Sequence, residues 1–310
     1  MTKKVLLATE KPFAPAARDK VVAVLKEARY EVVLLESYTD KAQLLDAVKD
    51  VDAMIIRSDK VDPAVLDAAK NLKLVVRAGA GYDNIDCAYA KQKGVFAMNT
   101  PGQNSNAVAE LVFGMMLMMA RGRFSGKSGT ELKGKTIGIH AVGNVGRCVA
   151  RIAKGFDMTV LGYHPRRTAE VIRAAGAEPV DSAETLYAKS EYISLHVPAT
   201  PENKQSIGKA LLMSMPKNAC VINTARKEVI HEPELLEVFE ARPDFRYATD
   251  VEPSAEVAKV LQEKYADRFF MTPKKMGAQT SEANVNAGIA AAEQIVAFFE
   301  KNDRQFIVNA

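Results

Sequence analysis

Apolar positions along the chain fall into short runs that alternate with amphipathic segments. Strand-like runs are predicted before residue 101 at 4–9, 30–36, 51–58, 72–78 and 95–100. Helical spacing of apolar positions lies between them, at 16–28, 41–48, 63–69 and 85–92. Because apolar strands joined by helices are typical of parallel sheets, this alternation predicts a doubly wound α/β domain with helices on both faces of the sheet.

The alternation resumes after a strongly apolar helical segment at 104–121 and a glycine-containing stretch at 126–129. Further strands are predicted at 136–139, 158–161, 191–198, 219–225, 246–251 and 269–273, and a last apolar helix at 282–300. We expect the helices at 104–121 and 282–300 to connect two domains, with the C-terminal segment folded back onto the first domain. The predicted bounds are 1–100 with 282–310 for one domain, and 101–281 for an inserted second domain.

A glycine turn joins the predicted strand at 136–139 to the helix that follows it. A strand, a glycine turn and a helix in this order are typical of a site where backbone N–H groups bind a dinucleotide pyrophosphate. The alternative is a glycine-rich turn in an ordinary α/β domain. Ala141 stands where the first glycine of the fingerprint is usual, and we expect its φ to stay negative so that the turn tolerates a Cβ. The residues predicted to bind the dinucleotide here are Gly143, Asn144, Val145 and Gly146.

The position after the second strand of this unit bears on the choice of dinucleotide. An acidic residue there would bind the ribose hydroxyls, but the sequence has His164, followed by Pro165, Arg166 and Arg167. A missing carboxylate with two arginines would accept a 2′-phosphate, yet the arginines could equally be a solvated helix start. NAD and NADP therefore both stay open on these residues.

Composition and charge exclude several classes of protein. With 48% apolar and 26% charged residues, the chain is typical of a globular protein. A net charge of +4 without a basic stripe argues against nucleic-acid binding. The longest apolar run, 111–120, is about half of a bilayer span, and the N-terminal residues lack the core of a signal peptide, so we expect a cytoplasmic protein without a membrane segment. Cys87, Cys148 and Cys220 lack metal-ligand spacing, which predicts buried free thiols and no metal site.

Four stretches resemble the D-2-hydroxyacid dehydrogenase family, and its D-3-phosphoglycerate dehydrogenase branch in particular. They are IIRSDKVD (55–62), VVRAGAGYDNID (75–86), MNTPGQNSNAVAE (98–110) and VINTARKEVI (221–230), and with the glycine turn and SLHVPAT (194–200) they cover most of the chain. The resemblance implies a flavodoxin-like substrate domain, an inserted Rossmann domain that binds NAD, and a homodimer. It also implies oxidation of D-3-phosphoglycerate, a small phosphorylated 2-hydroxy acid, to 3-phosphohydroxypyruvate, and the short form without a C-terminal regulatory domain.

Arginines at strand ends are the candidates for binding an anionic substrate. Arg57 and Arg77 each lie at the end of a predicted first-domain strand, the edge where open α/β sheets bind ligands. A guanidinium binds phosphate or carboxylate in a bidentate fork, whereas the alternative is two surface ion pairs. The resemblance assigns substrate binding to these two arginines together with Ser58, Asn104 and the backbone of Ala78, Gly79, Ala80 and Gly81.

In the second domain the resemblance implies that Arg226 orients the substrate carboxylate and polarises the C2 oxygen. The further residues predicted to contact the cofactor are His164, His196, Thr224 and Asp250. Without the resemblance, His196 would be interpreted as a histidine satisfied by its neighbours at a strand end.

The family's usual general base, a histidine near the C-terminus held by a glutamate, is absent. The histidines are His140, His164, His196 and His231, and all of them precede Asp250. In MTPKKMGAQTSEAN (271–284), Lys275 aligns with the histidine when the match runs back from GAQTSEA, and Lys274 when it runs forward from TP. The first match is longer, so we expect Lys275 to be the acid/base.

A lysine base near pH 7 needs a pKa lowered by about 2–3 units, which desolvation and nearby Arg226 would favour. Our hypothesis is that Lys275 replaces the whole histidine–glutamate pair, and that Glu252, the equivalent of the glutamate, is peripheral. The alternative is that both lysines are solvated loop residues and catalysis is lost. Two other functions also stay open: a glyoxylate or hydroxypyruvate reductase, and a non-catalytic, dinucleotide-sensing corepressor.

Overall fold

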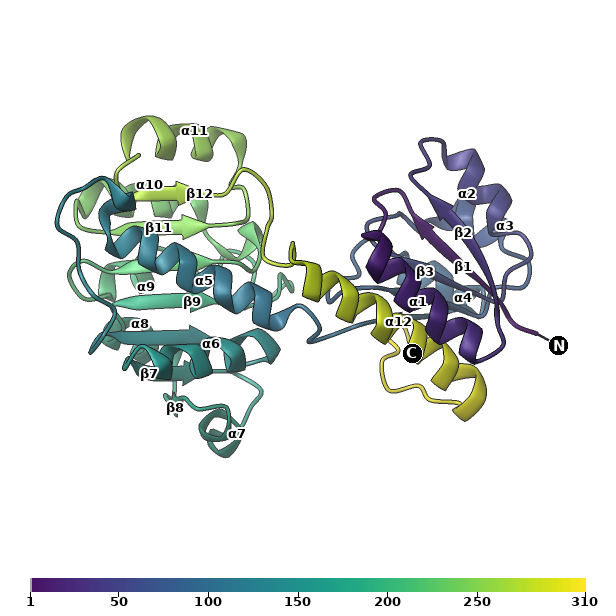
Figure 1. The fold of residues 1–310 in the computed structure, drawn as a ribbon. Helices are drawn as coiled ribbons and strands as arrows, with labels where there is room; N and C mark the ends of the chain where they lie inside the picture. The colour runs from purple at the N-terminus through teal and green to yellow at the C-terminus, as the bar shows by residue number, and fades with distance from the viewer. Residues whose placement is uncertain (1) are drawn as a thin grey trace. The chain divides into compact units, whose positions relative to one another are not determined.

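Residues from both halves of the sequence build the first of two units in the computed structural model, which describes residues 2–310 (Figure 1). Unit 1 contains the chain up to Asn104 together with Gln279–Ala310, and unit 2 contains Ser105–Ala278. The C-terminal segment therefore folds back onto the unit that the N-terminal segment forms.

Unit 1 is built on a five-stranded parallel sheet of order β2-β1-β3-β4-β5. Its strands are β1 (Lys4–Thr9), β2 (Glu31–Glu36), β3 (Ala53–Ile56), β4 (Leu74–Arg77) and β5 (Phe96–Asn99). Its helices are α1 (Pro15–Glu27), α2 (Lys41–Ala47), α3 (Pro63–Ala68), α4 (Cys87–Gln92) and α12 (Ser281–Lys301). The strand order reverses between β1 and β3, and this is the flavodoxin-like order that the resemblance implied.

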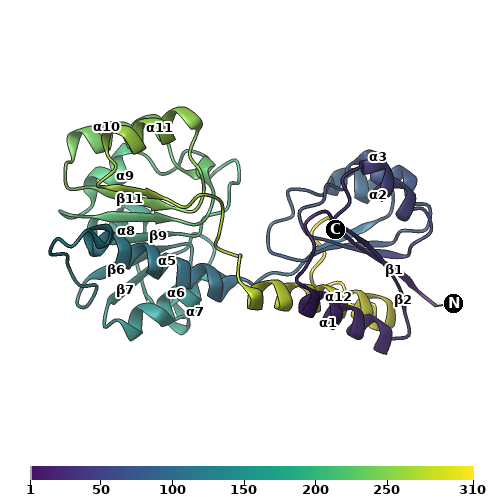
Figure 2. The ribbon, with the colours of Figure 1, turned by 45° about the horizontal axis from the view of Figure 1, so that its top comes forward.

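Helices cover both faces of this sheet because its strands are apolar at consecutive positions. Val5 and Leu7 of β1 pack in one cluster with α1 and α12, whereas Leu6 and Ala8 pack in another with α2, α3 and α4. Successive side chains of a strand point to opposite faces, so each strand contributes to both clusters. Figure 2 shows α1 and α12 on one side of the sheet and α2 and α3 on the other.

Unit 2 is built on a seven-stranded parallel sheet of order β12-β11-β10-β9-β6-β7-β8, and its strand order reverses between β6 and β9. The strands are β6 (Thr136–His140), β7 (Thr159–Tyr163), β8 (Glu178–Pro179), β9 (Tyr192–Leu195), β10 (Cys220–Asn223), β11 (Arg246–Thr249) and β12 (Phe269–Met271). The helices are α5 (Ser105–Ala120), η1 (Gly122–Phe124), α6 (Asn144–Gly155), α7 (Ala169–Ala174), α8 (Ala183–Lys189), α9 (Lys209–Ser214), η2 (Lys227–Val229), α10 (Glu232–Ala241) and α11 (Ala255–Lys264). This is the order of a Rossmann domain, so the prediction of two doubly wound parallel sheets is confirmed.

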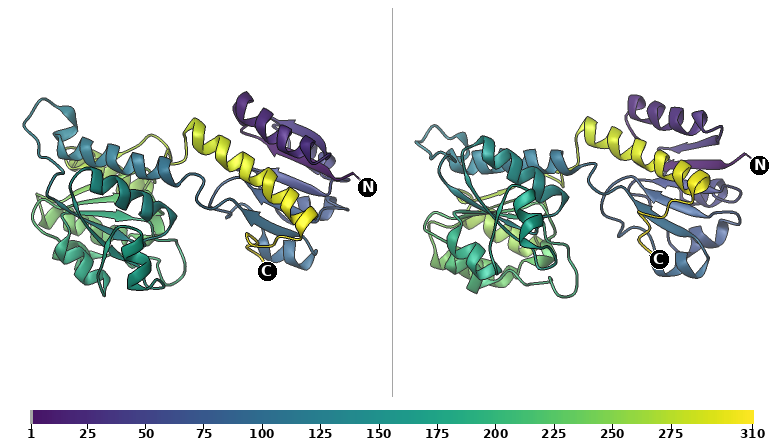
Figure 3. Two further views of the ribbon diagram at one scale, coloured as in Figure 1. Left: turned by 60° about the horizontal axis from the view of Figure 1, so that its bottom comes forward. Right: turned by 90° about the horizontal axis from the view of Figure 1, so that it is seen from below.

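The faces of the second sheet also divide its helices into two groups. Ile137 and Ile139 pack in a cluster with α5 and α6, which lie side by side in Figure 3. Ile193 and Leu195 pack in a second cluster with α8, α9, α10 and α11. The edge strand β8 was not predicted, because two residues, Glu178 and Pro179, give no apolar run.

Two expectations about single residue types need comment. All three cysteines are free thiols, but only Cys220 is buried, so the expected burial of Cys87 and Cys148 is wrong. Those two lie on helices, where part of the circumference faces solvent, whereas Cys220 lies on a central strand. Among residues 2–310, no helix combines the length and apolar character needed to span a bilayer.

Candidate active site

The turn between β6 and α6 has a different backbone from the one expected. Ala141 has a φ of +77°, so the expectation of a negative φ is wrong. Its N–H donates to Tyr163 O at 2.9 Å in the strand ladder, while its C=O accepts the N–H of Gly143 at 2.9 Å. Ala141 thus lies in the left-handed region, which costs a residue with a Cβ about 1–2 kcal/mol, and Val142 is the central residue of the turn that the Gly143 N–H closes.

The N-terminus of α6 is open to a ligand. Gly143 is the N-cap, and no side chain accepts a hydrogen bond from the first turn. A Cβ on Gly146 would lie 2.9 Å from Ala141 O and 3.0 Å from Ile139 Cγ2, so the helix approaches β6 as closely as only a glycine permits. The first N–H groups of the helix and the positive end of its dipole form the donor set that a pyrophosphate needs. The turn residues present thus fit a dinucleotide.

Three histidines lie at the carboxyl ends of β6, β7 and β9. His140 Nδ1 is 3.2 Å from Tyr187 Oη, and His196 Nε2 is 2.9 Å from Ser194 Oγ. Burial lowers the pKa of His140 to about 4 and that of His196 to about 3. Burial also lowers the pKa of His164, with the two following arginines acting in the same direction. All three rings are therefore neutral at pH 7.

Two polar groups at the ends of β10 and β11 are buried without a full set of partners. Asp250 is 1% exposed, and its Oδ2 accepts the N–H groups of Met276 at 3.2 Å and Gly277 at 2.7 Å. Within the described residues, its Oδ1 and the hydroxyl of Thr224 have no hydrogen-bond partner. Burial raises the pKa of Asp250, against the backbone donors and the charges of Lys275 and Arg226. A buried acceptor of this kind fits the carboxamide N–H₂ of a nicotinamide.

Lys275 and Arg226 converge on one strand end. Lys275 Nζ donates to Ala225 O at 3.2 Å, and Arg226 Nη1 donates to the same oxygen at 2.9 Å. Lys274 is exposed and contributes its C=O, which accepts the hydroxyl of Thr272 at 2.7 Å. The structure thus brings the ammonium of Lys275 to Arg226 and Asp250.

Two candidate residues of this group lie at the surface. The Lys275 side chain is exposed. Glu252 is also exposed, two residues after Asp250.

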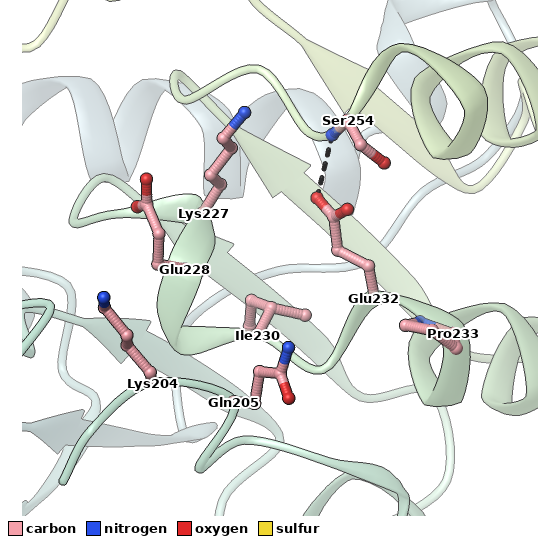
Figure 4. A pocket seen from close by; sticks show the side chains of 8 residues that line it. All are labelled: Lys204, Gln205, Lys227, Glu228, Ile230, Glu232, Pro233 and Ser254. Carbon is pink, nitrogen blue, oxygen red and sulfur yellow. Dashed lines mark hydrogen bonds between the residues drawn. The ribbon is translucent and has the colours of Figure 1, made fainter. Parts of the chain in front are cut away.

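A surface hollow is lined in part by the residues that follow β10 (Figure 4). Glu232 Oε1 accepts the N–H of Ser254 at 2.9 Å across it. Its lining residues are Lys204, Gln205, Lys227, Glu228, Ile230, Glu232, Pro233 and Ser254. None of the predicted site residues is among them, so this hollow is not the candidate active site.

In unit 1, Arg57 follows β3 and connects three segments of the chain. Its Nη1 donates to Lys11 O at 2.9 Å and Pro12 O at 2.7 Å, and its Nη2 donates to Asn284 Oδ1 at 2.7 Å. These acceptors are neutral. The Arg57 side chain is therefore fixed by hydrogen bonds to carbonyl and amide oxygens, and not by the surface ion pair that was the alternative. Among the described residues, its Nε–H and the second Nη2–H make no hydrogen bond and stay available to an anion.

Arg77, the last residue of β4, turns back over the loop 78–81. Its Nε donates to Arg57 O at 3.1 Å, and a Cβ on Gly79 would lie 1.5 Å from its Nη1. Gly79 has a φ of +149°, so the backbone favours glycine here, and the absent side chain leaves room for the Arg77 guanidinium. The guanidinium and the loop backbone lie together, as a shared anion site needs. Ala80 O accepts Asn99 Nδ2 at 2.6 Å, Ser58 is exposed, and Asn104 ends the first segment of the unit.

Asp59 was not singled out from the sequence, yet it organises this part of unit 1. It is 1% exposed and accepts hydrogen bonds from Glu10 N at 2.6 Å, Tyr38 Oη at 2.7 Å and Arg57 N at 3.0 Å. Two of these donors lie 49 and 21 residues away in the sequence. The sequence offered one indication of this role: Asp59 directly follows Arg57 and Ser58, two of the predicted substrate-binding residues.

Known proteins match both the sequence and the fold. Residues 107–274 match the family model "D-isomer specific 2-hydroxyacid dehydrogenase, NAD binding domain". The D-3-phosphoglycerate dehydrogenase of Methanocaldococcus jannaschii is 36% identical over 89% of this chain, which spans 55% of that relative's length. The hydroxypyruvate reductase of Thermotoga maritima is 34% identical over 89% of this chain and 94% of its own length.

Among solved structures, NAD⁺-bound 3-phosphoglycerate dehydrogenase of Entamoeba histolytica is similar, with a TM-score of 0.90 and 43% identity. The match covers 100% of this chain and 99% of that one. The chain therefore belongs to the D-isomer-specific 2-hydroxyacid dehydrogenase family and carries that family's NAD-binding domain.

Proposed function

We propose that this protein oxidises D-3-phosphoglycerate to 3-phosphohydroxypyruvate with NAD, unit 1 binding the substrate and unit 2 the dinucleotide. The observation that carries this proposal is the group of Lys275, Arg226 and Asp250 at the ends of β10 and β11, in a chain with no histidine after residue 250. The full-length similarity to the Entamoeba histolytica enzyme supports the same substrate. A homodimer and a cytoplasmic location are part of the proposal.

Each residue of the group has a separate task. NAD, when bound, accepts the hydride from C2. Lys275 Nζ exchanges the proton of the C2 oxygen, accepting it as the alcohol is oxidised and returning it as the ketone is reduced. Arg226 binds the substrate carboxylate and stabilises the charge that develops on the C2 oxygen. Asp250 accepts a hydrogen bond from the carboxamide through Oδ1, and Glu252 stays outside the proton transfer.

Unit 1 supplies the positive charge for a substrate with two anionic groups. The two N–H groups that Arg57 keeps available bind the phosphate together with Ser58. Arg77 and the N–H groups of the loop 78–81 bind the carboxylate side, and Asn104 completes the site. A guanidinium beside a backbone loop gives several donors to one anion, which is the arrangement that favours phosphate and carboxylate over neutral groups.

A hydroxypyruvate reductase is the second candidate. The Thermotoga maritima relative with that name matches over 94% of its length. In addition, three of the five N–H groups of Arg57 already donate hydrogen bonds inside unit 1. If those contacts persist with substrate, less of the guanidinium remains for a phosphate.

Reduction of 3-phosphohydroxypyruvate and of hydroxypyruvate with NADH tests the proposal. We expect kcat/KM to be about 100-fold higher for the phosphorylated substrate, because a site built for hydrogen bonds to a charged group rejects the analogue that lacks it. In the same assay Lys275→Ala should lower kcat by about 10²–10⁴-fold, while Lys274→Ala stays close to the original enzyme.

The outcomes separate the candidates. Partial rescue of Lys275→Ala by added ethylamine, with an unchanged dissociation constant for NADH, assigns proton transfer rather than a structural role. Equal kcat/KM values for the two substrates would favour the hydroxypyruvate reductase. A protein that binds NADH and reduces neither substrate would leave only the family membership in place.

A further inference from the structure

We propose that the dinucleotide site also accepts a ribose 2′-phosphate, through His164, Arg166 and Arg167. The same site would then bind NADP(H) as well as NAD(H). The inference concerns the adenosine end of the dinucleotide. It does not depend on which hydroxy acid is the substrate.

The first step concerns the residue that follows β7, the second strand of the Rossmann unit. An acidic side chain at this place accepts hydrogen bonds from the 2′- and 3′-hydroxyls of NAD and repels a 2′-phosphate. Here the residue is His164, and it lies beyond Tyr163 at the carboxyl end of the strand. The chain thus lacks the usual group that excludes NADP.

The second step concerns what the imidazole of His164 offers. Its Nδ1 accepts the N–H of Arg166 at 3.1 Å, so this nitrogen carries the ring's lone pair. The neutral ring then has its proton on Nε2. A ring that offers a donor and no acceptor suits the oxygens of a phosphate better than it suits a hydroxyl that must donate.

The third step is that the loop is fixed rather than loose. Arg167 N donates to His164 O at 3.3 Å, which closes a turn with Pro165 at its second position, where the fixed φ of proline is favoured. The hydrogen bond from Arg166 N to the ring closes the same turn from inside. Two arginines are therefore presented from a preformed turn directly after the ribose position.

The fourth step is the charge around the turn. Arg166 and Arg167 are exposed, and they are the charged groups whose effect on the pKa of His164 is resolved; both lower it. One carboxylate that interacts with Arg166 is Glu202, an exposed side chain on the loop after β9, and Arg166 contributes to lowering its pKa. A dianionic phosphate meets two guanidinium groups and one solvated carboxylate here, a net attraction.

Titration of the protein with NADH and with NADPH, without any hydroxy acid, tests the inference. We expect the two dissociation constants to agree within about tenfold. Arg166→Ala and Arg167→Ala should each weaken NADPH by about tenfold and leave NADH within about twofold, because a charge-assisted hydrogen bond is lost for one ligand only. His164→Asp should weaken NADPH by about 100-fold or more and leave NADH unchanged or tighter.

Arg173→Ala is the matched control. Arg173 is an exposed arginine on α7 of the same unit and pairs with Glu178 at 3.4 Å, so its removal changes the net charge equally. It should change neither dissociation constant. The inference is overturned if NADPH binds the original protein more than about 100-fold more weakly than NADH. It is also overturned if Arg173→Ala weakens NADPH as much as the loop variants do, or if the protein binds neither dinucleotide.

Discussion

The two parallel sheets present different surfaces at the points where their strand orders reverse. At β6 and β9, unit 2 presents backbone: an uncapped helix N-terminus after Gly143 and a left-handed backbone conformation at Ala141. At β1 and β3, unit 1 presents side chains: Asp59 joins the two strand ends through Glu10 N and Arg57 N, and Arg57 ties down Lys11 and Pro12. A reversal of strand order thus presents a different kind of surface in each unit.

With the proposed function, this difference predicts where each kind of specificity resides. A pyrophosphate is common to all dinucleotides and is bound by groups that every residue has, so few side chains are needed. A small hydroxy acid is distinguished by its charged groups, which only side chains can match. We therefore expect substitutions in unit 1 to change the choice of acid, and substitutions after β7 to change the choice of dinucleotide.

The largest effect is expected from removing the Asp59 carboxylate. Asp59→Ala leaves the partly buried donors Glu10 N, Tyr38 Oη and Arg57 N without this acceptor, and should lower the free energy of unfolding of unit 1 by about 3 kcal/mol. Urea unfolding followed by hydrogen exchange on peptides of each unit measures the loss. Asp46→Ala removes an exposed carboxylate paired with Lys49 and should cost less than about 0.5 kcal/mol.

An unchanged dissociation constant for NADH would support the comparison of the two units, because the loss of stability would then be confined to unit 1. A loss of NADH affinity as large as the loss of stability would contradict the comparison, since a carboxylate of unit 1 would then control dinucleotide binding.

A smaller effect is expected from acid. All four histidines of the sequence lie between residues 140 and 231, in unit 2. Burial lowers the pKa of His140 from 6.5 to about 4. The unfolded chain therefore binds the proton first, and stability is lost as the pH falls from 6.5 toward 4. Between pH 7 and pH 5 the loss from His140 is about 2 kcal/mol.

Hydrogen exchange at pH 7 and pH 5, corrected for the intrinsic exchange rates, measures this loss unit by unit. His140→Gln should remove about half of the pH dependence of unit 2, because glutamine does not titrate, while His196, whose pKa burial lowers to about 3, loses a similar amount over the same range. An equal loss in unit 1, which has no histidine, would contradict the assignment to His140.

The smallest effect is expected at the dinucleotide turn. Ala141→Gly relieves a φ of +77° but adds backbone freedom to the unfolded chain and removes a buried methyl group, so stability should stay within about 1 kcal/mol of the original protein. Ala150→Gly, in the middle of α6, should lose more than about 1 kcal/mol, since there is no strain to relieve. Thermal unfolding of both variants measures the difference. A loss at Ala141 as large as at Ala150 would contradict the relief of strain.

The sequence predicted every described strand except β8 because these strands are apolar on both faces, and it predicted the helices of unit 1 from their regular apolar spacing. It failed where hydrogen bonds between distant residues decide the geometry. The φ of Ala141 depends on Tyr163 O, and Asp59 has meaning only through donors brought together by the fold. The residues of the candidate site, Lys275 among them, were chosen by motif and stay predictions. The structure adds the contact of Lys275 Nζ with Ala225 O, which no spacing could give.

The division of unit 1 between both ends of the described chain has a consequence for the order of events during synthesis. The ribosome synthesises all of Ser105–Ala278 before it synthesises α12. The apolar face of α12 packs in one hydrophobic cluster with α1 and β1. Unit 2 can therefore close its core on the nascent chain while the first five strands still await their last helix. For this protein we therefore expect the usual order, in which the N-terminal unit folds first, to be inverted.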